Sequence, residues 1–181
     1  MQSENLIQTL LEQVKQSINQ VEKLKHLNED MLTWRENSTS WNILECLEHL
    51  NLYGDFYLVQ MENEIKNSKT QPELEFNSGY LGGYFTKSML PKGKLNKMKT
   101  FKDKNPLHAN LDKTVIDRFI NQQIKLLELI NQSRNVSLNK VKIKTSISSL
   151  IKLKLGDTFR FYLNHIIRHL NQIERIQVAL K

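Results

Sequence analysis

The segment NHIIRHLNQI, residues 164–173, holds two of the chain's five histidines, His165 and His169, four residues apart. On a helix this spacing puts both side chains on one face, with Cβ atoms about 6 Å apart. Two such imidazoles can bind one metal ion at about 2.0 to 2.1 Å each. A hydrogen-bonded core pair and a chance pairing are the alternatives. Because His169 falls in an apolar stripe between Ile166 and Ile173, where an unpaired imidazole is costly, metal binding is favoured.

A third ligand is needed to complete a metal site, and His49 is the best candidate. It lies in ECLEHL beside the apolar positions Leu47 and Leu50, so its side chain is expected to point partly inward. Three histidines with an open position are typical of a catalytic rather than a structural metal site. Taken alone, His49 also fits a histidine at the core boundary. Glu45, one turn earlier, is an orienter of His49 or an alternative ligand, although a cap or solvent-facing role is simpler.

The other candidate groups are interpreted as structural. His26 and His108 fall at a helix end and in a proline-containing loop, so both are left out of the site. Cys46 lies on a different helix face from the neighbouring histidine and is expected to be a buried, inert thiol. Arg168 is about 100° round the helix from the histidine that follows it, which indicates a surface or interface position. A single cysteine allows no disulfide within the monomer, so a reducing, cytoplasmic location is expected.

Four segments repeat apolar residues at spacings of three and four, which predicts amphipathic helices. These helices are expected over about residues 4–27, 41–66, 110–133 and 156–176. Ser38, Ser40 and Asn42 are cap candidates for the second helix, and Asp157 is one for the fourth. Gly54 inside the second helix costs about 1 kcal/mol relative to alanine, which close packing of another helix could offset.

Four such helices without a secure strand predict an all-α fold, an antiparallel four-helix bundle forming one domain over residues 1–181. The first two helices are joined by a short connection and are expected to pack side by side. The connection between the second and third helices, residues 67–110, is long and contains all three prolines. Connections of that length are usually functional or carry a short helix. Residues 141–147 alternate like a short strand, but no sheet is expected.

Charge and hydropathy limit the classes of partner. The net charge is +7, and lysines cluster over residues 87–104 and 140–154. Arginine is absent from both clusters and aromatic residues are few. Proteins that recognise nucleic acids usually combine arginine with stacking aromatic residues, so a nucleic-acid partner is not expected. No apolar run of about 18 residues is present, so neither a membrane span nor a membrane partner is expected. The N-terminus lacks the basic and apolar blocks of a signal peptide.

Two segments, SWNILECLEHL (residues 40–50) and FRFYLNHIIRHLNQIERI (residues 159–176), resemble the signature regions of the DinB-like superfamily, which includes the YfiT-type thiol transferases. In that family a tryptophan-containing helix start leads to a histidine on the second helix. The fourth helix carries the pattern His-x-x-x-His-Leu-x-Gln-Ile. The likeness in helix count and loop placement extends over essentially the whole chain, while the specific motifs are confined to these two segments.

The resemblance implies a four-helix bundle with an unusual helix order and a divalent metal ion, zinc or nickel, held by three histidines near one end. Carried over, these ligands are His49, His165 and His169. Many members are homodimers, so a homodimer is expected here. Some members transfer low-molecular-weight thiols onto electrophiles or isomerise through a thiol cofactor. One departure is Ile166, which stands where relatives often have an acid, so a potential general base is missing.

The expected function is that of a metal-dependent transferase or hydrolase of the thiol-transferase type, acting on a small molecule, with its catalytic residues unknown. The alternative is a metal-binding or stress-related binding protein without turnover. Within the long connection, Tyr80, Tyr84 and Phe85 are expected to roof the site. The lysines of residues 87–104 are expected to attract an acidic thiol or an acidic substrate.

Overall fold

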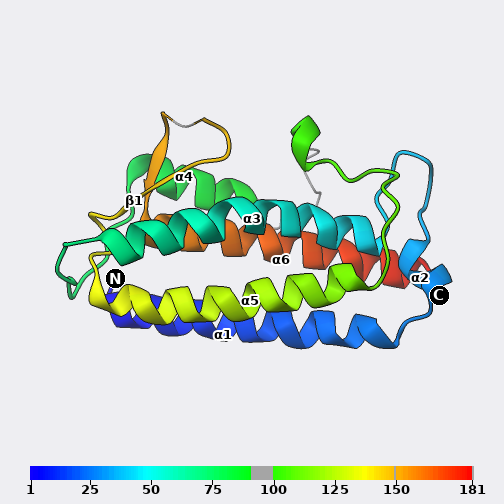
Figure 1. The fold of residues 1–181 in the computed structure, drawn as a ribbon, viewed down its shortest axis with the longest axis horizontal. Coiled ribbons are helices and arrows are strands. Elements are labelled where there is room, and N and C mark those ends of the chain that lie inside the picture. The colour runs from blue at the N-terminus through cyan, green and yellow to red at the C-terminus, as the bar shows by residue number, and fades with distance from the viewer. Residues whose placement is uncertain (91–99, 149, 181) are drawn as a thin grey trace.

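The protein is mostly helical in a computed structural model that describes residues 1–90, 100–148 and 150–180. Four long helices lie alongside one another (Figure 1). They are α1 (Ser3–Glu22), α3 (Ile43–Asn67), α5 (Thr114–Gln132) and α6 (Leu155–Ala179). Each corresponds to one of the four predicted segments, because the apolar stripes of those segments form the core between them. The first helix is shorter than predicted, since its last turn tightens into the 3-10 helix η1 (Lys23–His26).

Shorter elements fill the connections: α2 (Glu29–Thr33), α4 (Tyr80–Met89), η2 (Lys102–Lys104), η3 (Ser133–Asn135), β1 (Lys142–Lys144) and β2 (Lys152–Lys154). The long connection therefore does carry a helix of its own. The antiparallel pair of β1 and β2 corrects the expectation that no sheet forms. Its central residues, Ile143 and Leu153, are buried, and burial of these two side chains against the helices supports strands too short to be predicted from alternation.

The helices pack in an order that their sequence order does not follow. Both α5 and α6 pack against α1 and against α3, whereas α1 and α3 make few contacts with each other. The prediction that the first two helices lie side by side is therefore wrong. In Figure 1, α3 and α5 run in the same direction and α1 and α6 run in the opposite direction. The long connection between α3 and α5 makes this possible, because it returns the chain to the end at which α3 began.

Helix α3 begins at a capping box. The Asn42 side chain accepts a hydrogen bond from the Glu45 amide at 2.8 Å, and the Glu45 carboxylate accepts one from the Asn42 amide at 2.9 Å. Of the cap candidates, Asn42 is thus the N-cap residue. Further along α3, a Cβ atom on Gly54 would lie 2.0 Å from Oε1 of Gln122. The glycine is therefore explained by the close approach of α5, as expected.

Helix α6 begins one residue earlier than predicted, at Leu155, with Lys154 as its N-cap residue, so Asp157 is not the cap. The Asp157 carboxylate instead accepts hydrogen bonds from the Ser78 hydroxyl and the Gly79 amide, at 2.5 and 2.8 Å. It thereby joins the start of α4 to the first turn of α6. Among the described residues, no helix is long and apolar enough to cross a membrane.

Candidate metal centre

Three histidines from two helices converge in the interior. His49 lies in the second turn of α3, and His165 and His169 lie in the middle of α6, which packs against α3. Nε2 of His165 is 3.2 Å from Nε2 of His49 and 3.1 Å from Nε2 of His169. The three candidate ligand atoms lie within 4.8 Å of one another, and all three side chains are buried. The structure therefore brings together the three histidines singled out from the sequence.

The hydrogen bonds made by the Nδ1 atoms determine which nitrogen atom of each imidazole keeps a free lone pair. Nδ1 of His49 lies 2.7 Å from the Lys104 carbonyl oxygen, and Nδ1 of His169 lies 3.0 Å from Oε1 of Gln172. Because both partners are acceptors, each Nδ1 must carry the proton, and each Nε2 presents a lone pair. Nδ1 of His165 is buried without a hydrogen-bond partner in the part of the chain that the structure describes.

These tautomers leave the cluster unsatisfied by protein groups alone. His165 can place at most one proton on Nε2, so it can donate to only one of the two lone pairs that face it. With the proton on Nδ1, three lone pairs face one another. A cation between them would accept all three. Nitrogen ligands at 2.0 to 2.1 Å in a tetrahedral arrangement are about 3.3 Å apart, and the observed separations of 3.1 and 3.2 Å fit.

Burial keeps the three imidazoles in the neutral form that binds metal ions. It lowers the pKa of His49 to about 4, although the hydrogen bond to the Lys104 carbonyl opposes the shift. Burial, with the charge of His49 as a smaller cause, lowers the pKa of His169 to about 3. The pKa of His165 is also held well below its ordinary value, chiefly by burial. At neutral pH no proton therefore competes with a metal ion for these nitrogen atoms.

Aromatic rings line the cluster. The Trp41 ring centroid lies 4.6 Å from that of His49 and 5.8 Å from that of His169. Tyr53 lies 4.9 Å from His49 and 4.7 Å from His165, ring centroid to ring centroid. Burial raises the pKa of Tyr53 to about 12, so its phenol keeps its proton at neutral pH. The surroundings of the histidines are thus apolar, which strengthens electrostatic interactions within the site.

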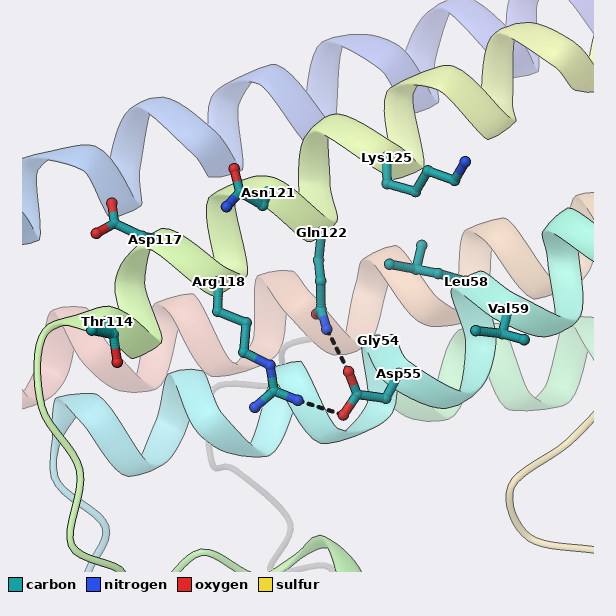
Figure 2. Close-up of a pocket in the computed structure, with 10 residues that line it drawn as sticks. All are labelled: Gly54, Asp55, Leu58, Val59, Thr114, Asp117, Arg118, Asn121, Gln122 and Lys125. Atoms are coloured by element: carbon teal, nitrogen blue, oxygen red, sulfur yellow. Dashed lines mark hydrogen bonds and ion pairs between the residues drawn. The ribbon is translucent and has the colours of Figure 1, made fainter.

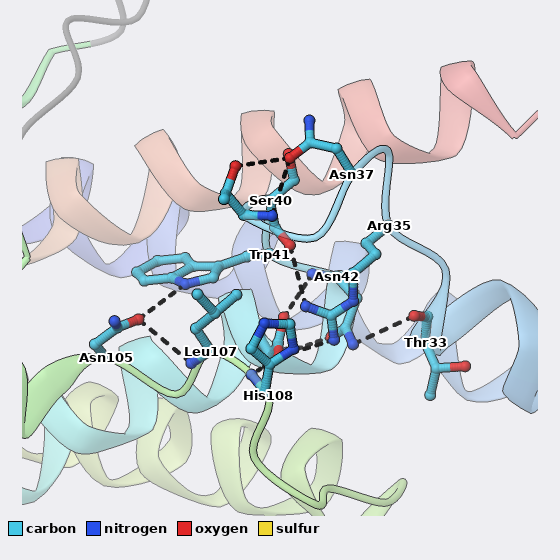
Figure 3. Close-up of polar contacts among 11 residues, drawn as sticks. Thr33, Arg35, Asn37, Ser40, Trp41, Asn42, Asn105, Leu107 and His108 are labelled. Carbon is cyan, nitrogen blue, oxygen red and sulfur yellow. Dashed lines mark hydrogen bonds and ion pairs between the residues drawn. The ribbon is translucent and has the colours of Figure 1, made fainter.

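Glu45 anchors the loop that touches His49. Its carboxylate is fully buried, and Oε1 accepts hydrogen bonds from the Arg35 guanidinium at 3.0 Å and from the His108 amide at 2.6 Å. Figure 3 shows Arg35 and His108 meeting beside the start of α3. Glu45 makes no hydrogen bond to His49, so among the described residues it is neither a ligand nor a direct orienter. The simpler interpretation as a helix-capping residue is confirmed.

Asn105 completes this support. Its Oδ1 atom accepts hydrogen bonds from Nε1 of Trp41 at 3.0 Å and from the Leu107 amide at 3.3 Å (Figure 3). The residue before it is Lys104, whose carbonyl oxygen holds His49. One short loop therefore positions both the ring that packs on His49 and the carbonyl that sets its tautomer. Such outer contacts usually matter for metal affinity nearly as much as the ligands.

The remaining predictions for single residues have mixed outcomes. His26 and His108 lie outside the cluster, as expected. Cys46 is fully buried, and burial raises the pKa of its thiol, so the inert interpretation is confirmed. The prediction of a surface or interface position for Arg168 is wrong, since Arg168 is only 8% exposed within the single chain. Helix α6 packs against α1, α3 and α4, so little of its circumference reaches solvent.

Helix α4 does not cover the histidines with its tyrosines. Tyr80 and Tyr84 are 94% and 66% exposed, because α4 buries Thr86 and Met89 instead. The predicted roof of Tyr80 and Tyr84 is therefore wrong, and the cluster is instead contacted by Trp41 and by the Lys104 carbonyl at the end of η2. Of the predicted lysine cluster, residues 91–99 lie outside the described residues.

Sequence reasoning missed several groups around the cluster. Gln172 and Tyr53 were detectable, since they follow His169 and His49 by three and four residues on the same helices. The Lys104 carbonyl carries no sequence signal, because every residue has one. Among the described residues, no carboxylate hydrogen-bonds to the three imidazoles.

A second polar region lies between α3 and α5, in a shallow groove shown in Figure 2. Its cations are paired within the protein. Arg118 contacts Glu48 at 2.9 Å and Asp55 at 2.5 Å, and Lys125 contacts Glu62 at 2.6 Å. These charged groups are neutralised in place, so the groove offers no charge that requires a ligand.

Together, the fold and the site define the class of this protein: a mostly helical chain with a buried three-histidine cluster. Residues 10–173 match the family model of the DinB superfamily, and the chain belongs to that superfamily. It matches no curated protein and no solved structure at a significant level.

Proposed function

We propose that the protein binds one divalent metal ion, zinc or nickel, through His49, His165 and His169, within a DinB-type four-helix bundle. The observation that carries the proposal is the convergence of three buried Nε2 atoms while the Nδ1 atoms of His49 and His169 are held by acceptors. This arrangement presents lone pairs to one point, and protein groups alone leave it unsatisfied.

The surrounding residues prepare the site. The Lys104 carbonyl and the Gln172 amide hold two imidazoles in the ligating tautomer, and Trp41 and Tyr53 keep their surroundings apolar. A divalent ion there would supply Lewis-acid chemistry, which lowers the pKa of a coordinated water or thiol. Three protein ligands leave a position open for such a group.

The function that this site supports best is that of a metal-dependent transferase or hydrolase of the thiol-transferase type, acting on a small molecule. The chain's own thiol, Cys46, is fully buried, so a reacting thiol has to come from a low-molecular-weight cofactor. Tyr53 remains protonated and can donate a hydrogen bond to a bound group. A cytoplasmic homodimer, as in many members of the superfamily, is part of this proposal.

The alternative is a metal-binding or stress-related protein without turnover. Ile166, at the position where relatives often have an acid, is fully buried in the core. No carboxylate of the described residues hydrogen-bonds to the imidazoles. Both functions require the metal ion, and only turnover separates them.

Elemental analysis of the untagged protein tests the shared part of the proposal. About one divalent ion per chain is expected in the wild type and in His26→Ala, which removes an exposed histidine outside the cluster. His169→Ala should retain none. A metal-free wild type that also takes up neither zinc nor nickel on dialysis would mean that the cluster is a polar core.

Turnover is tested with the metal-loaded protein, a panel of low-molecular-weight thiols and an electrophile such as a chlorinated aromatic. Thiol adducts that form with the wild type and not with His169→Ala support the transferase. Stoichiometric metal without any product, and without hydrolysis of activated esters or amides, supports the binding protein instead.

A further inference from the structure

The β1–β2 hairpin has one strongly basic face. Side chains alternate along a strand, so the burial of Ile143 and Leu153 directs their neighbours away from the core. These neighbours, called the lysine face, are Lys142, Lys144, Lys152 and Lys154. The register places them opposite one another in two pairs. Like charges directly opposite across strands destabilise a sheet, so this face has a cost that folding alone does not explain.

Acidic groups do not neutralise most of the lysine face. The sequence contains no acid between Glu128 and Asp157. Among the described residues, Lys142, Lys144 and Lys152 form no ion pair, in contrast to the paired cations of the α3–α5 groove. The face therefore presents positive charge to an anionic partner.

Two exposed aliphatic side chains stand among the serine and threonine residues that connect the two strands. Leu150 is 91% exposed and Ile147 is 43% exposed, directly beside the lysine face. The tip projects beyond the long helices in Figure 1. It is also held in place, because the Ser146 amide donates a hydrogen bond to the Tyr57 hydroxyl at 3.1 Å. Ile147 and Leu150 thus present aliphatic side chains to water.

Helix α4 extends this surface. It packs beside β2, and the side chain of Lys154 would lie 3.6 Å from a Cβ atom on Gly79. The next residue, Tyr80, is 94% exposed, and Tyr84 one turn later is 66% exposed. Tyrosine is enriched where one end of a side chain meets apolar surroundings and the other meets water, as at the surface of a bilayer.

We propose that the hairpin and the exposed side of α4 form a binding surface for a bilayer that contains anionic lipid. Lysines neutralise lipid headgroups, while Leu150, Ile147 and the tyrosines enter the boundary between headgroups and acyl chains. A nucleic acid fits less well, because the lysine face has no arginine and the aliphatic tip has no place on a phosphate backbone. The expectation of no membrane partner rested on the lack of a spanning segment, which peripheral binding does not require.

Sedimentation with phosphatidylcholine vesicles, with and without phosphatidylglycerol, tests the proposal on the full chain at low salt. Binding is expected only with phosphatidylglycerol and is reversed by salt. Lys144→Gln/Lys152→Gln should bind about 30-fold more weakly, roughly fivefold for each lysine. The matched control, Lys15→Gln/Lys23→Gln, removes the same charge from exposed positions on α1 and η1 and should bind like the wild type.

Two changes at Leu150 separate a bilayer from other polyanions. Leu150→Ser should weaken binding at least tenfold, because it removes the aliphatic side chain that enters the bilayer. Leu150→Trp should add fluorescence whose emission shifts to the blue with anionic vesicles. Absence of binding to these vesicles would overturn the proposal, as would equal weakening in the Lys15/Lys23 control. Unchanged binding of Leu150→Ser, with full competition by a short duplex DNA, would assign the lysine face to nucleic acid instead.

Discussion

The histidine cluster and the α3–α5 groove are both built on α3, yet their polar groups are satisfied in different ways. In the groove, Arg118 contacts the carboxylates of Glu48 and of Asp55, the second of which Figure 2 shows, and Lys125 contacts a third carboxylate. In the cluster, three buried imidazoles face one another, and no arrangement of their protons satisfies every nitrogen atom. The charged groups of the groove are paired as folded, whereas the described protein groups leave the cluster with an unsatisfied nitrogen atom.

The difference shows that concavity alone is a poor guide to a ligand site in this protein. The groove is partly exposed, and water and counter-charges stabilise its groups at little cost. The cluster is buried among aromatic rings, where an unsatisfied polar atom costs more. The stronger indication of a ligand is thus the polar group that burial leaves without a partner. Four predictions test this difference between the groove and the cluster, and they are given from the largest expected effect to the smallest.

The largest effect is expected when zinc is added to metal-free protein. At a free zinc concentration of about 10⁵ times Kd, binding stabilises the folded state by about 7 kcal/mol, which raises Tm by roughly 14 to 27 °C. His165→Leu should abolish this rise, while Arg118→Leu in the groove should retain it. Scanning calorimetry measures both. An undiminished rise in His165→Leu would mean that zinc binds outside the cluster.

Acid should destabilise the metal-free protein through the same histidines. Their pKa values in the folded state are lowered, to about 4 for His49 and about 3 for His169, so the unfolded chain binds more protons. Stability is therefore complete above about pH 6.5 and falls as the pH drops toward these values, by up to about 2 kcal/mol per histidine at about pH 5. Urea unfolding at both pH values measures the loss.

His165→Leu should lose less stability over that interval, because one of the three buried imidazoles is gone. The groove contains no histidine, so Arg118→Leu should show the same loss as the wild type. An equal loss in the wild type and in His165→Leu would contradict the assignment of acid lability to the cluster.

A smaller effect is expected from Glu45→Gln, which weakens the anchor of the loop that carries the Lys104 carbonyl. Metal affinity should fall about 10-fold, the low end of the usual range for groups that orient a ligand, because Glu45 acts on His49 only through the loop. Glu48→Gln is the matched control, since it removes a charge one turn away that faces Arg118. Competition with a chromophoric chelator measures both affinities. A circular-dichroism spectrum like that of the wild type shows that α3 is intact.

The smallest effect is expected in the groove itself. Arg118 is 41% exposed, and exposed ion pairs contribute at most about 1 kcal/mol to the free energy of unfolding. Arg118→Gln should therefore change stability by about that amount or less and leave metal affinity unchanged. Urea unfolding and a zinc titration check the two statements. A loss of several kcal/mol would show that the contrast between the two regions is overstated.

The helices were predictable because apolar spacing of three and four is a local property of the chain. The cap at Asn42 followed from its residue type, but the sequence could not show that Asp157, an equally good cap, would instead accept hydrogen bonds from the start of α4. Helix neighbours were also unpredictable. A short connection favoured packing of α1 on α3, and the long connection before α5 decided otherwise.

By itself, the sequence determined the positions of the long helices and, through the resemblance of its two motifs, the three histidines as one group. Residue type and helical spacing carry that information. The tertiary structure alone decided that the Lys104 carbonyl and Gln172 orient two of the rings, that Arg168 is buried, and that Leu150 is exposed beside the lysine face. Each of these depends on segments far apart in the chain or on backbone groups common to all residues, and only folding brings them together.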